Sequence, residues 1–306
     1  MGHPWQKRLD PTPSDGPDPY GNPDPEWLRI DWRQHLQTVE LGWSTRLNYV
    51  EMGSGPPLLL VHGLGGCWQN WLENIPHFAR THRVLAPDLP GFGASPMPRW
   101  RTSIRSYGQV LIDFCAEVGA ERAAVVGNSM GGFIAAELSI ASRPLVSRLC
   151  LVSAAGVSHS RMHVAPAATM ARMGAALSPL AFRYHEQALR RPGLRHRVLR
   201  NLFYKPAALR QELVWEFVHT GITSPALVSA VRGLANYDIL DRLEEVDDPV
   251  LIVWGRNDMV VPPADGLAFA KALPNSRLEV FDRCGHLPMA ERPVRFNRLL
   301  ERFLAE

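Results

Sequence analysis

The sequence predicts an α/β protein whose mostly parallel central sheet is flanked by helices and carries an inserted helical cap. From about residue 36, short apolar runs alternate with stretches of helical periodicity, a pattern typical of parallel strands joined by helices. Residues 157–237 break this alternation, because they contain helical patterns and several prolines but no convincing strand. That length is too great for a connecting loop in a compact domain, so we expect an inserted subdomain.

The expected parallel strands are continuous apolar runs, as strands buried on both faces require. These runs are residues 58–61, 84–86, 123–126, 149–152 and 250–254. Residues 277–281 alternate more between apolar and polar side chains, which indicates an edge strand. Residues 38–41 and 46–51, on either side of Gly42, are expected to form an antiparallel hairpin before the first parallel strand.

Apolar residues at steps of three and four predict two helices that pack on the sheet. The first apolar face consists of Ile104, Tyr107, Leu111, Phe114 and Val118. The second, at the C-terminus, consists of Phe296, Leu299, Leu300, Phe303 and Leu304.

Three parts follow from this pattern. Residues 1–35 form an N-terminal extension whose first 25 residues carry seven prolines, a composition expected to be extended or in part flexible. Residues 36–156 and 238–306 form the core, and residues 157–237 form the cap. The cap holds eleven Lys and Arg residues against three Glu, although the whole chain has a net charge of only +3. We therefore expect a basic cap on an acidic body.

Composition argues against several classes of function. The small net charge gives no reason to expect a nucleic acid partner. The first ten residues lack the apolar run of a secretory signal, and no stretch of about 18 apolar residues occurs, so we expect a soluble, cytoplasmic protein. The four cysteines are far apart and lack metal-ligand spacing, which predicts reduced structural thiols and no metal site.

The most informative motif is GNSMGG at residues 127–132, which follows an apolar run and precedes a helix-compatible segment. A G-x-S-x-G nucleophile elbow requires this strand–turn–helix context. The glycines allow a serine to occupy a tight, strained turn and the helix to pack closely on the strand. The start of that helix directs the N–H of Met130 toward a developing oxyanion. Ser129 is therefore the predicted nucleophile.

A serine hydroxyl needs a base, and the base needs an acid that fixes its orientation. Asp258 follows the run 250–254, and His286 follows the run 277–281, both at strand ends where open α/β sheets build their sites. The chain order Ser, Asp, His predicts a triad of Ser129, Asp258 and His286. Three nearby carboxylates are weaker candidates for the acid: Asp238, Asp241 and Asp265.

The motif HGLGG at residues 62–66 follows the first parallel run. Its glycines let the backbone turn toward the sheet edge, where a second N–H could join that of Met130 in an oxyanion hole. Leu64 is the predicted second donor and Gly65 is its rival. His62 is expected to be a structural hydrogen-bonding residue.

Together these motifs resemble the α/β-hydrolase superfamily. HGLGG, DLPGFGAS at residues 88–95, GNSMGG, GRNDMVVP and GHLPMAERP follow the order and approximate spacing of that family. The resemblance covers roughly residues 36–156 and 238–306. It implies an α/β-hydrolase fold with a lid over the site, and acyl transfer to water without a cofactor. Asp88 belongs to a family signature and is interpreted as shaping a loop.

The predicted substrate is a carboxylic ester of a small or lipid-like apolar molecule. A serine nucleophile argues against the haloalkane dehalogenase and epoxide hydrolase branches, which carry Asp. Asn128 before the serine makes GNSMGG similar to the meta-cleavage C–C hydrolases, so C–C hydrolysis is the alternative. Leu287 stands where those enzymes usually carry Trp, and HGLGG replaces their HGxGPG.

A non-catalytic ligand-binding protein on the same fold is a second alternative. Relatives that have lost catalysis usually lack part of the triad. The basic cap raises a further hypothesis of weak contact with anionic lipid or an acyl carrier. The oligomeric state does not follow from the sequence.

Overall fold

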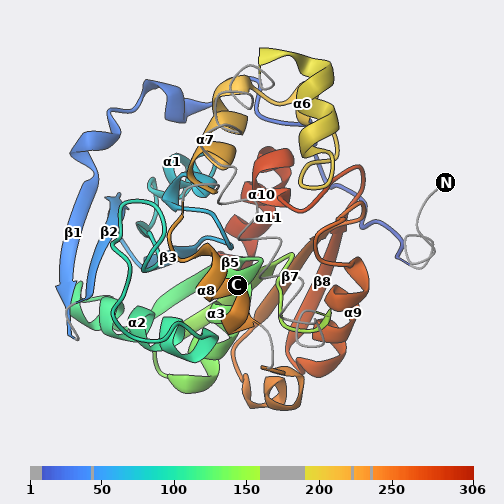
Figure 1. The fold of residues 1–306 in the computed structure, drawn as a ribbon. Helices are drawn as coiled ribbons and strands as arrows, with labels where there is room; N and C mark the ends of the chain where they lie inside the picture. The colour runs from blue at the N-terminus through green and yellow to red at the C-terminus, as the bar shows by residue number, and fades with distance from the viewer. Residues whose placement is uncertain (1–8, 43–44, 159–189, 222–223, 235–236) are drawn as a thin grey trace.

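An eight-stranded sheet lies at the centre of the protein (Figure 1). The structure, a computed structural model, describes residues 9–42, 45–158, 190–221, 224–234 and 237–306. The strands are β1 (Leu36–Leu41), β2 (Thr45–Met52), β3 (Pro57–Val61), β4 (Arg83–Pro87), β5 (Ala123–Asn128), β6 (Val146–Val152), β7 (Val250–Gly255) and β8 (Ser276–Phe281). Their order is β1-β2-β4-β3-β5-β6-β7-β8. β2 pairs antiparallel with β1 and β4, and all other pairs are parallel.

Helices cover both faces of the sheet (Figure 1). The α-helices of the core are α1 (Ile75–Phe78), α2 (Ile104–Glu117), α3 (Met130–Ala141), α9 (Pro263–Ala272), α10 (Pro288–Glu291) and α11 (Pro293–Ala305). Short 3-10 helices are η2 (Glu26–Arg29), η3 (Trp32–Gln34), η4 (Trp68–Trp71), η6 (Pro206–Ala208) and η7 (Leu240–Glu245).

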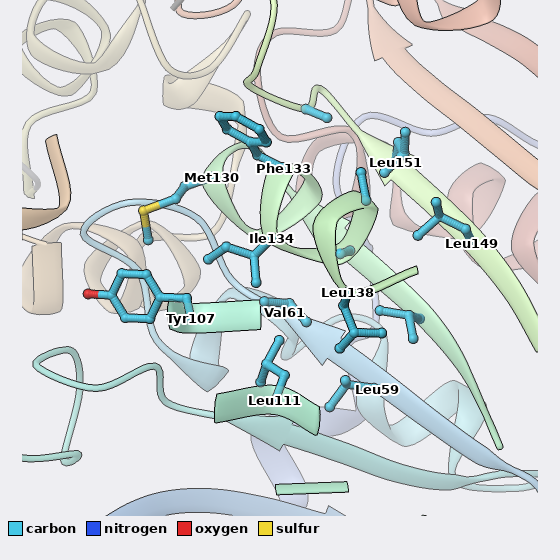
Figure 2. Close-up of a cluster of buried hydrophobic side chains, with 14 of the residues drawn as sticks. Leu59, Val61, Tyr107, Leu111, Met130, Phe133, Ile134, Leu138, Leu149 and Leu151 are labelled. Carbon is cyan, nitrogen blue, oxygen red and sulfur yellow. The ribbon is translucent and has the colours of Figure 1, made fainter. Parts of the chain in front are cut away.

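Alternate residues of the buried strands serve two separate hydrophobic clusters, because successive side chains of a strand point to opposite faces. Leu59 and Val61 of β3 pack with residues of α2 and α3 (Figure 2). Leu58 and Leu60 of the same strand face the second cluster, which contains residues of α1 and α11. Burial on both faces explains why β3 is an unbroken apolar run.

The predicted strands, the hairpin and both predicted helices are confirmed, with ends that differ by up to three residues. β6 begins at Val146, three residues before the predicted run. Its second and third residues are the partly exposed Ser147 and Arg148, so the apolar pattern becomes continuous only at Leu149. β8 lies at the end of the strand order, as the alternation predicted. The start of α2 is fixed by Ser103, whose hydroxyl accepts a hydrogen bond from the N–H of Ser106.

Residues 9–25 of the N-terminal extension form no helix or strand, η2 and η3 follow them, and the segment is bonded to the body. The N–H of Thr12 donates to Val280 O (2.9 Å), and Thr12 Oγ1 accepts from Val280 N (3.0 Å). Further along, Asp18 accepts from Arg295 of α11 (3.4 Å). The proline-rich composition did not predict these bonds, because their partners lie on the last strand and helix. Residues 1–8 of the flexible segment expected there lie outside the described residues.

The described part of the predicted cap is helical. It consists of α6 (Pro192–Leu199), η6, α7 (Gln211–Gly221) and α8 (Leu227–Leu234), and the described residues between 157 and 237 include no strand. Residues 159–189, 222–223 and 235–236 of this prediction lie outside the described residues. Arg195 is buried and donates to Ala207 O (2.8 Å), so not every cap arginine faces solvent. In the described chain, no helix combines the length and apolar character needed to cross a bilayer.

Candidate active site

Ser129 lies at the junction between β5 and α3, in a strained backbone conformation. Its φ of 54° and ψ of −119° are unusual for a residue with a side chain, and such strain costs on the order of 1–3 kcal/mol. Hydrogen bonds from Ser129 N to Val152 O and from Ala155 N to Ser129 O, both 2.9 Å, hold the turn against β6. The elbow therefore presents a serine side chain that is only partly buried.

The glycines around Ser129 are required by close backbone approach. A Cβ on Gly131 would lie 2.3 Å from Val61 O, and a Cβ on Gly127 would lie 2.3 Å from Gly131 O. Neither position can hold a larger residue without moving the strand or the helix. The close packing of α3 on the sheet, predicted from GNSMGG, is present.

The structure brings Asp258 and His286 together. Asp258 Oδ2 lies 2.8 Å from His286 Nδ1, and both side chains are buried. Asp258 Oδ1 accepts from the N–H groups of Val260 (2.8 Å) and Val261 (2.9 Å), which fixes the carboxylate. With Nδ1–H donating to Asp258, Nε2 of the neutral imidazole carries a lone pair that can accept a proton.

The rival carboxylates have other partners or positions. Asp265 accepts from Ser158 N (3.0 Å), and Asp238 accepts from Leu240 N (3.0 Å). Asp241 lies in the first turn of η7. Among the four candidates, the structure joins Asp258 to His286.

Ser129 and His286 line one cavity of about 70 Å³. The other described residues around it are Gly63, Leu64, Gly65, Gly66, Asn70, Asn128, Leu202, Phe217 and Leu287. None of these is an acidic or basic side chain. Leu202 and Phe217 belong to the predicted cap, so this part of the chain contributes to the wall of the cavity beside the serine.

The HGLGG loop lies directly against the nucleophile. A Cβ on Gly63 would be 3.1 Å from Ser129 Cβ, and the loop turns through a bond from Gly66 N to Gly63 O (3.0 Å). Leu64 and its rival Gly65, which has a φ of 72°, both line the cavity. Met130 begins α3, where the N–H groups of the first turn have no partner within the helix. The predicted oxyanion donors are therefore placed around Ser129, and their roles stay a prediction.

The family model described as the alpha/beta hydrolase fold matches residues 56–293, which is more than half of the chain. The chain belongs to the α/β-hydrolase family. The match confirms the predicted fold and spans every residue of the predicted triad and oxyanion hole.

Relatives of this α/β-hydrolase represent more than one reaction. An uncharacterized protein of Mycobacterium tuberculosis is 31% identical over 269 residues, covering 82% of this chain and 76% of its own. The 2-hydroxy-6-oxo-6-phenylhexa-2,4-dienoate hydrolase of Comamonas testosteroni is 32% identical over 273 residues, covering 85% and 91%. The solved structure of a bacterial membrane phospholipase A gives a TM-score of 0.69 at 27% identity, covering 88% and 85%. These similarities support a hydrolase and do not confirm the ester class.

His62 and Asp88 shape the loops of the hydrolase beside the site. His62 Nδ1 donates to Gly63 O (2.8 Å) and Nε2 accepts from Leu89 N (2.9 Å), so both ring nitrogens are occupied. Burial lowers the pKa of His62 to about 4, which keeps the ring neutral. Asp88 accepts from Trp68 N (2.8 Å) and from Ala94 N (2.9 Å). Both residues have the structural roles expected of them.

Two buried polar residues beside the site were missed by the sequence analysis. Asn70 lines the cavity, and among the described residues its Nδ2 has no hydrogen-bond partner. Glu291 Oε1 accepts from the N–H groups that flank His286, those of Gly285 (2.9 Å) and Leu287 (3.3 Å). Glu291 is the fifth residue after His286 in the motif GHLPMAERP, and its place in this motif was the signal that could have pointed to it. By contrast, burial raises the pKa of the Cys284 thiol well above its usual value, which argues against a second nucleophile.

Glu291 should make stability depend on pH. Burial raises its pKa from 4.5 to about 7. Between these values the folded state holds a proton that the unfolded state has lost, so stability falls as pH rises through this window. The shift corresponds to about 3 kcal/mol. We expect the free energy of unfolding of the wild type, measured in urea against Glu291→Gln, to fall by up to this amount between pH 5 and pH 8.

The comparison isolates Glu291, because every other titrating group is common to the two proteins. The assignment would be contradicted if the free energies of unfolding of wild type and Glu291→Gln differed by the same amount at every pH between 5 and 8.

Proposed function

We propose that this α/β-hydrolase cleaves carboxylic esters of small or lipid-like apolar molecules through an acyl-enzyme on Ser129. The observation that carries the proposal is the bond of 2.8 Å between Asp258 and His286, formed where His286 and the strained Ser129 line the same cavity. A buried acid–histidine pair beside a partly buried serine hydroxyl is the arrangement that nucleophilic acyl transfer needs.

Acylation begins when His286 Nε2 removes the proton of Ser129 Oγ as the oxygen attacks the ester carbonyl carbon. Negative charge moves to the carbonyl oxygen, where the N–H groups of Met130 and Leu64, or of its rival Gly65, stabilise it. The tetrahedral intermediate collapses, and the imidazolium gives its proton to the departing alcohol. His286 then deprotonates a water molecule that attacks the acyl carbon. The bond between that carbon and Ser129 Oγ breaks as His286 returns the proton to Oγ, and the acid is released. Asp258 holds the ring in the required tautomer throughout.

The lining of the cavity favours a neutral ester. Apart from His286, none of its described residues is basic, and a desolvated carboxylate without a cationic partner or several donors is strongly unfavourable. The dienoate named for the Comamonas testosteroni hydrolase is a carboxylate, so this lining suits it poorly. The likeness to a phospholipase A supports the ester assignment.

C–C bond hydrolysis of a vinylogous diketone is the second candidate, since the same triad serves it. Two observations favour it: the identity to the Comamonas testosteroni hydrolase, and the amide of Asn70. Asn70 lines the cavity, and its Nδ2, which is buried and has no partner among the described residues, would reach a carbonyl or carboxylate oxygen of a substrate only after a turn of the side chain. Asn128 is less available, because its Nδ2 donates to Val152 O (3.1 Å) and His286 O (3.4 Å).

A series of p-nitrophenyl esters from acetyl to long acyl chains tests the proposal. We expect hydrolysis, and the acyl-chain length with the highest rate measures the space beside Ser129, of which the cavity lined by described residues provides about 70 Å³. The measurement is kcat/KM across the series, with the Ser129→Ala protein as the blank.

The same preparations are offered a vinylogous diketone and a fluorophosphonate. Cleavage of the diketone without ester hydrolysis would favour the second candidate. A folded protein that hydrolyses neither substrate and is not labelled at Ser129 would instead support a non-catalytic binding protein.

A further inference from the structure

The carboxylate of Glu291 joins three distant parts of the chain at the catalytic histidine. While Oε1 accepts from Gly285 N and Leu287 N, Oε2 accepts from Tyr204 N (2.7 Å) and from the hydroxyl of Tyr20 (2.7 Å). Tyr204 belongs to the predicted cap and Tyr20 to the N-terminal extension. When Glu291 is ionised, above its pKa of about 7, the four donors use all the lone pairs that its two oxygens offer, so the group has one preferred orientation.

The backbone of His286 itself is held by the same surroundings. Its N–H donates to Leu202 O (2.9 Å), and its carbonyl accepts from Asn128 Nδ2 (3.4 Å). A Cβ on Gly285 would lie 2.9 Å from both Leu202 O and Tyr204 N, so the histidine loop and the cap segment touch directly. Each N–H from residue 285 to 287 therefore has a fixed acceptor.

Tyr20, from the N-terminal extension, supplies the remaining hydrogen bond to Glu291. Its hydroxyl donates to Glu291 and accepts from Lys205 N (2.7 Å), while the guanidinium of Arg292 lies 5.2 Å from the centre of its ring. Burial and the adjacent carboxylate raise the pKa of Tyr20, so its hydroxyl stays a neutral donor.

We propose that Glu291 is a positioning residue for His286 and that Tyr20, alone among the residues of the extension that this network contains, completes the hydrogen bonds of Glu291. The inference rests on the proposed function, because it takes His286 to be the catalytic base. A displacement of about 1 Å in a catalytic group can lower the rate about 10²-fold. Fixing the N–H groups on both sides of His286 limits such displacement.

The substitution Glu291→Gln tests the carboxylate with little change of shape. An amide has one acceptor oxygen, so whichever way it turns, its NH₂ faces a pair of N–H or O–H donors. Either the two bonds to the histidine loop or the two bonds to Tyr20 and Tyr204 are lost. Tyr20→Phe is milder, because it removes one donor to Glu291 and the acceptor for Lys205 N.

Thr12→Val is the matched control. Thr12 also anchors the N-terminal extension through its hydroxyl, which accepts from Val280 N (3.0 Å), and it makes no bond to Glu291. A loss caused by general loosening of the extension would occur in this variant as well.

The readouts are kcat and KM on the preferred p-nitrophenyl ester, the downfield proton resonance of the bond between His286 Nδ1 and Asp258, and thermal unfolding. We expect Glu291→Gln to lower kcat about 10²-fold and Tyr20→Phe about tenfold, with KM changed less than about twofold. The resonance should shift or broaden in both variants and stay unchanged in Thr12→Val.

A folded Glu291→Gln protein with wild-type kcat and an unchanged resonance would overturn the proposal. So would a loss of kcat in Thr12→Val equal to that in Tyr20→Phe. If Glu291→Gln does not fold, Tyr20→Phe decides by the same criteria. If the wild type hydrolyses no ester, the proposed function fails, and the resonance still tells whether Glu291 and Tyr20 hold the histidine.

Discussion

Replacing Ser129 with alanine is expected to lower kcat on the preferred ester by about 10⁶-fold. The hydroxyl is the atom that forms the acyl-enzyme, and no other described side chain on the cavity wall offers a comparable nucleophile. Alanine keeps the backbone strain at φ 54°, so the fold and thermal unfolding should change little. Steady-state hydrolysis and fluorophosphonate labelling measure the loss.

Ser153→Ala is the matched control for this experiment. Ser153 also follows a strand of the sheet and also has a positive φ, of 45°, but it is buried and does not line the cavity. Its activity should stay within about twofold of the wild type. Retention of more than about 1% of kcat by Ser129→Ala would refute the nucleophile assignment.

Asp258→Asn is expected to lower kcat by about 10⁴-fold, as loss of the orienting acid does in other triads. The oxygen of the new amide will stay with the N–H groups of Val260 and Val261, because those donors need an acceptor. Its NH₂ then faces His286 Nδ1 and forces the ring proton onto Nε2. In that tautomer Nε2 donates and can no longer remove the proton of Ser129.

Asp265→Asn provides the comparison, since Asp265 is also a buried carboxylate in this half of the core and bonds Ser158 rather than His286. We expect nearly normal kcat from it. A kcat of Asp258→Asn within about tenfold of the wild type would show that the ring is held by other means.

The fold and the contact between Asp258 and His286 could be predicted because their signals are local in the sequence. β3 and β5 are apolar runs because both of their faces are buried, and the glycines of GNSMGG report how closely α3 approaches Val61. Asp258 and His286 each follow a strand, so strand positions alone were enough to place them together.

Glu291 could not be predicted in the same way. Its partner Tyr20 is 271 residues away in the sequence, and nothing in the pattern links the two. A glutamate between Ala290 and Arg292 is typical of a solvated helix face, since unpaired carboxylates are rarely buried. Asn70 was missed for a similar reason, because only the folded loop shows that this residue lines the cavity. The ester or C–C preference depends on side-chain directions that periodicity does not give.

The bonds between Thr12 and Val280 also bear on how two copies of the protein would meet. β8 is the last strand of the sheet, and the free edge of an open sheet offers N–H and C=O groups that can pair with a strand of another molecule. Thr12 occupies both backbone groups of Val280, near the carboxyl end of that edge. The extension thereby blocks edge-to-edge pairing at this point, so a shortened chain that begins after Thr12 would gain a site for aggregation.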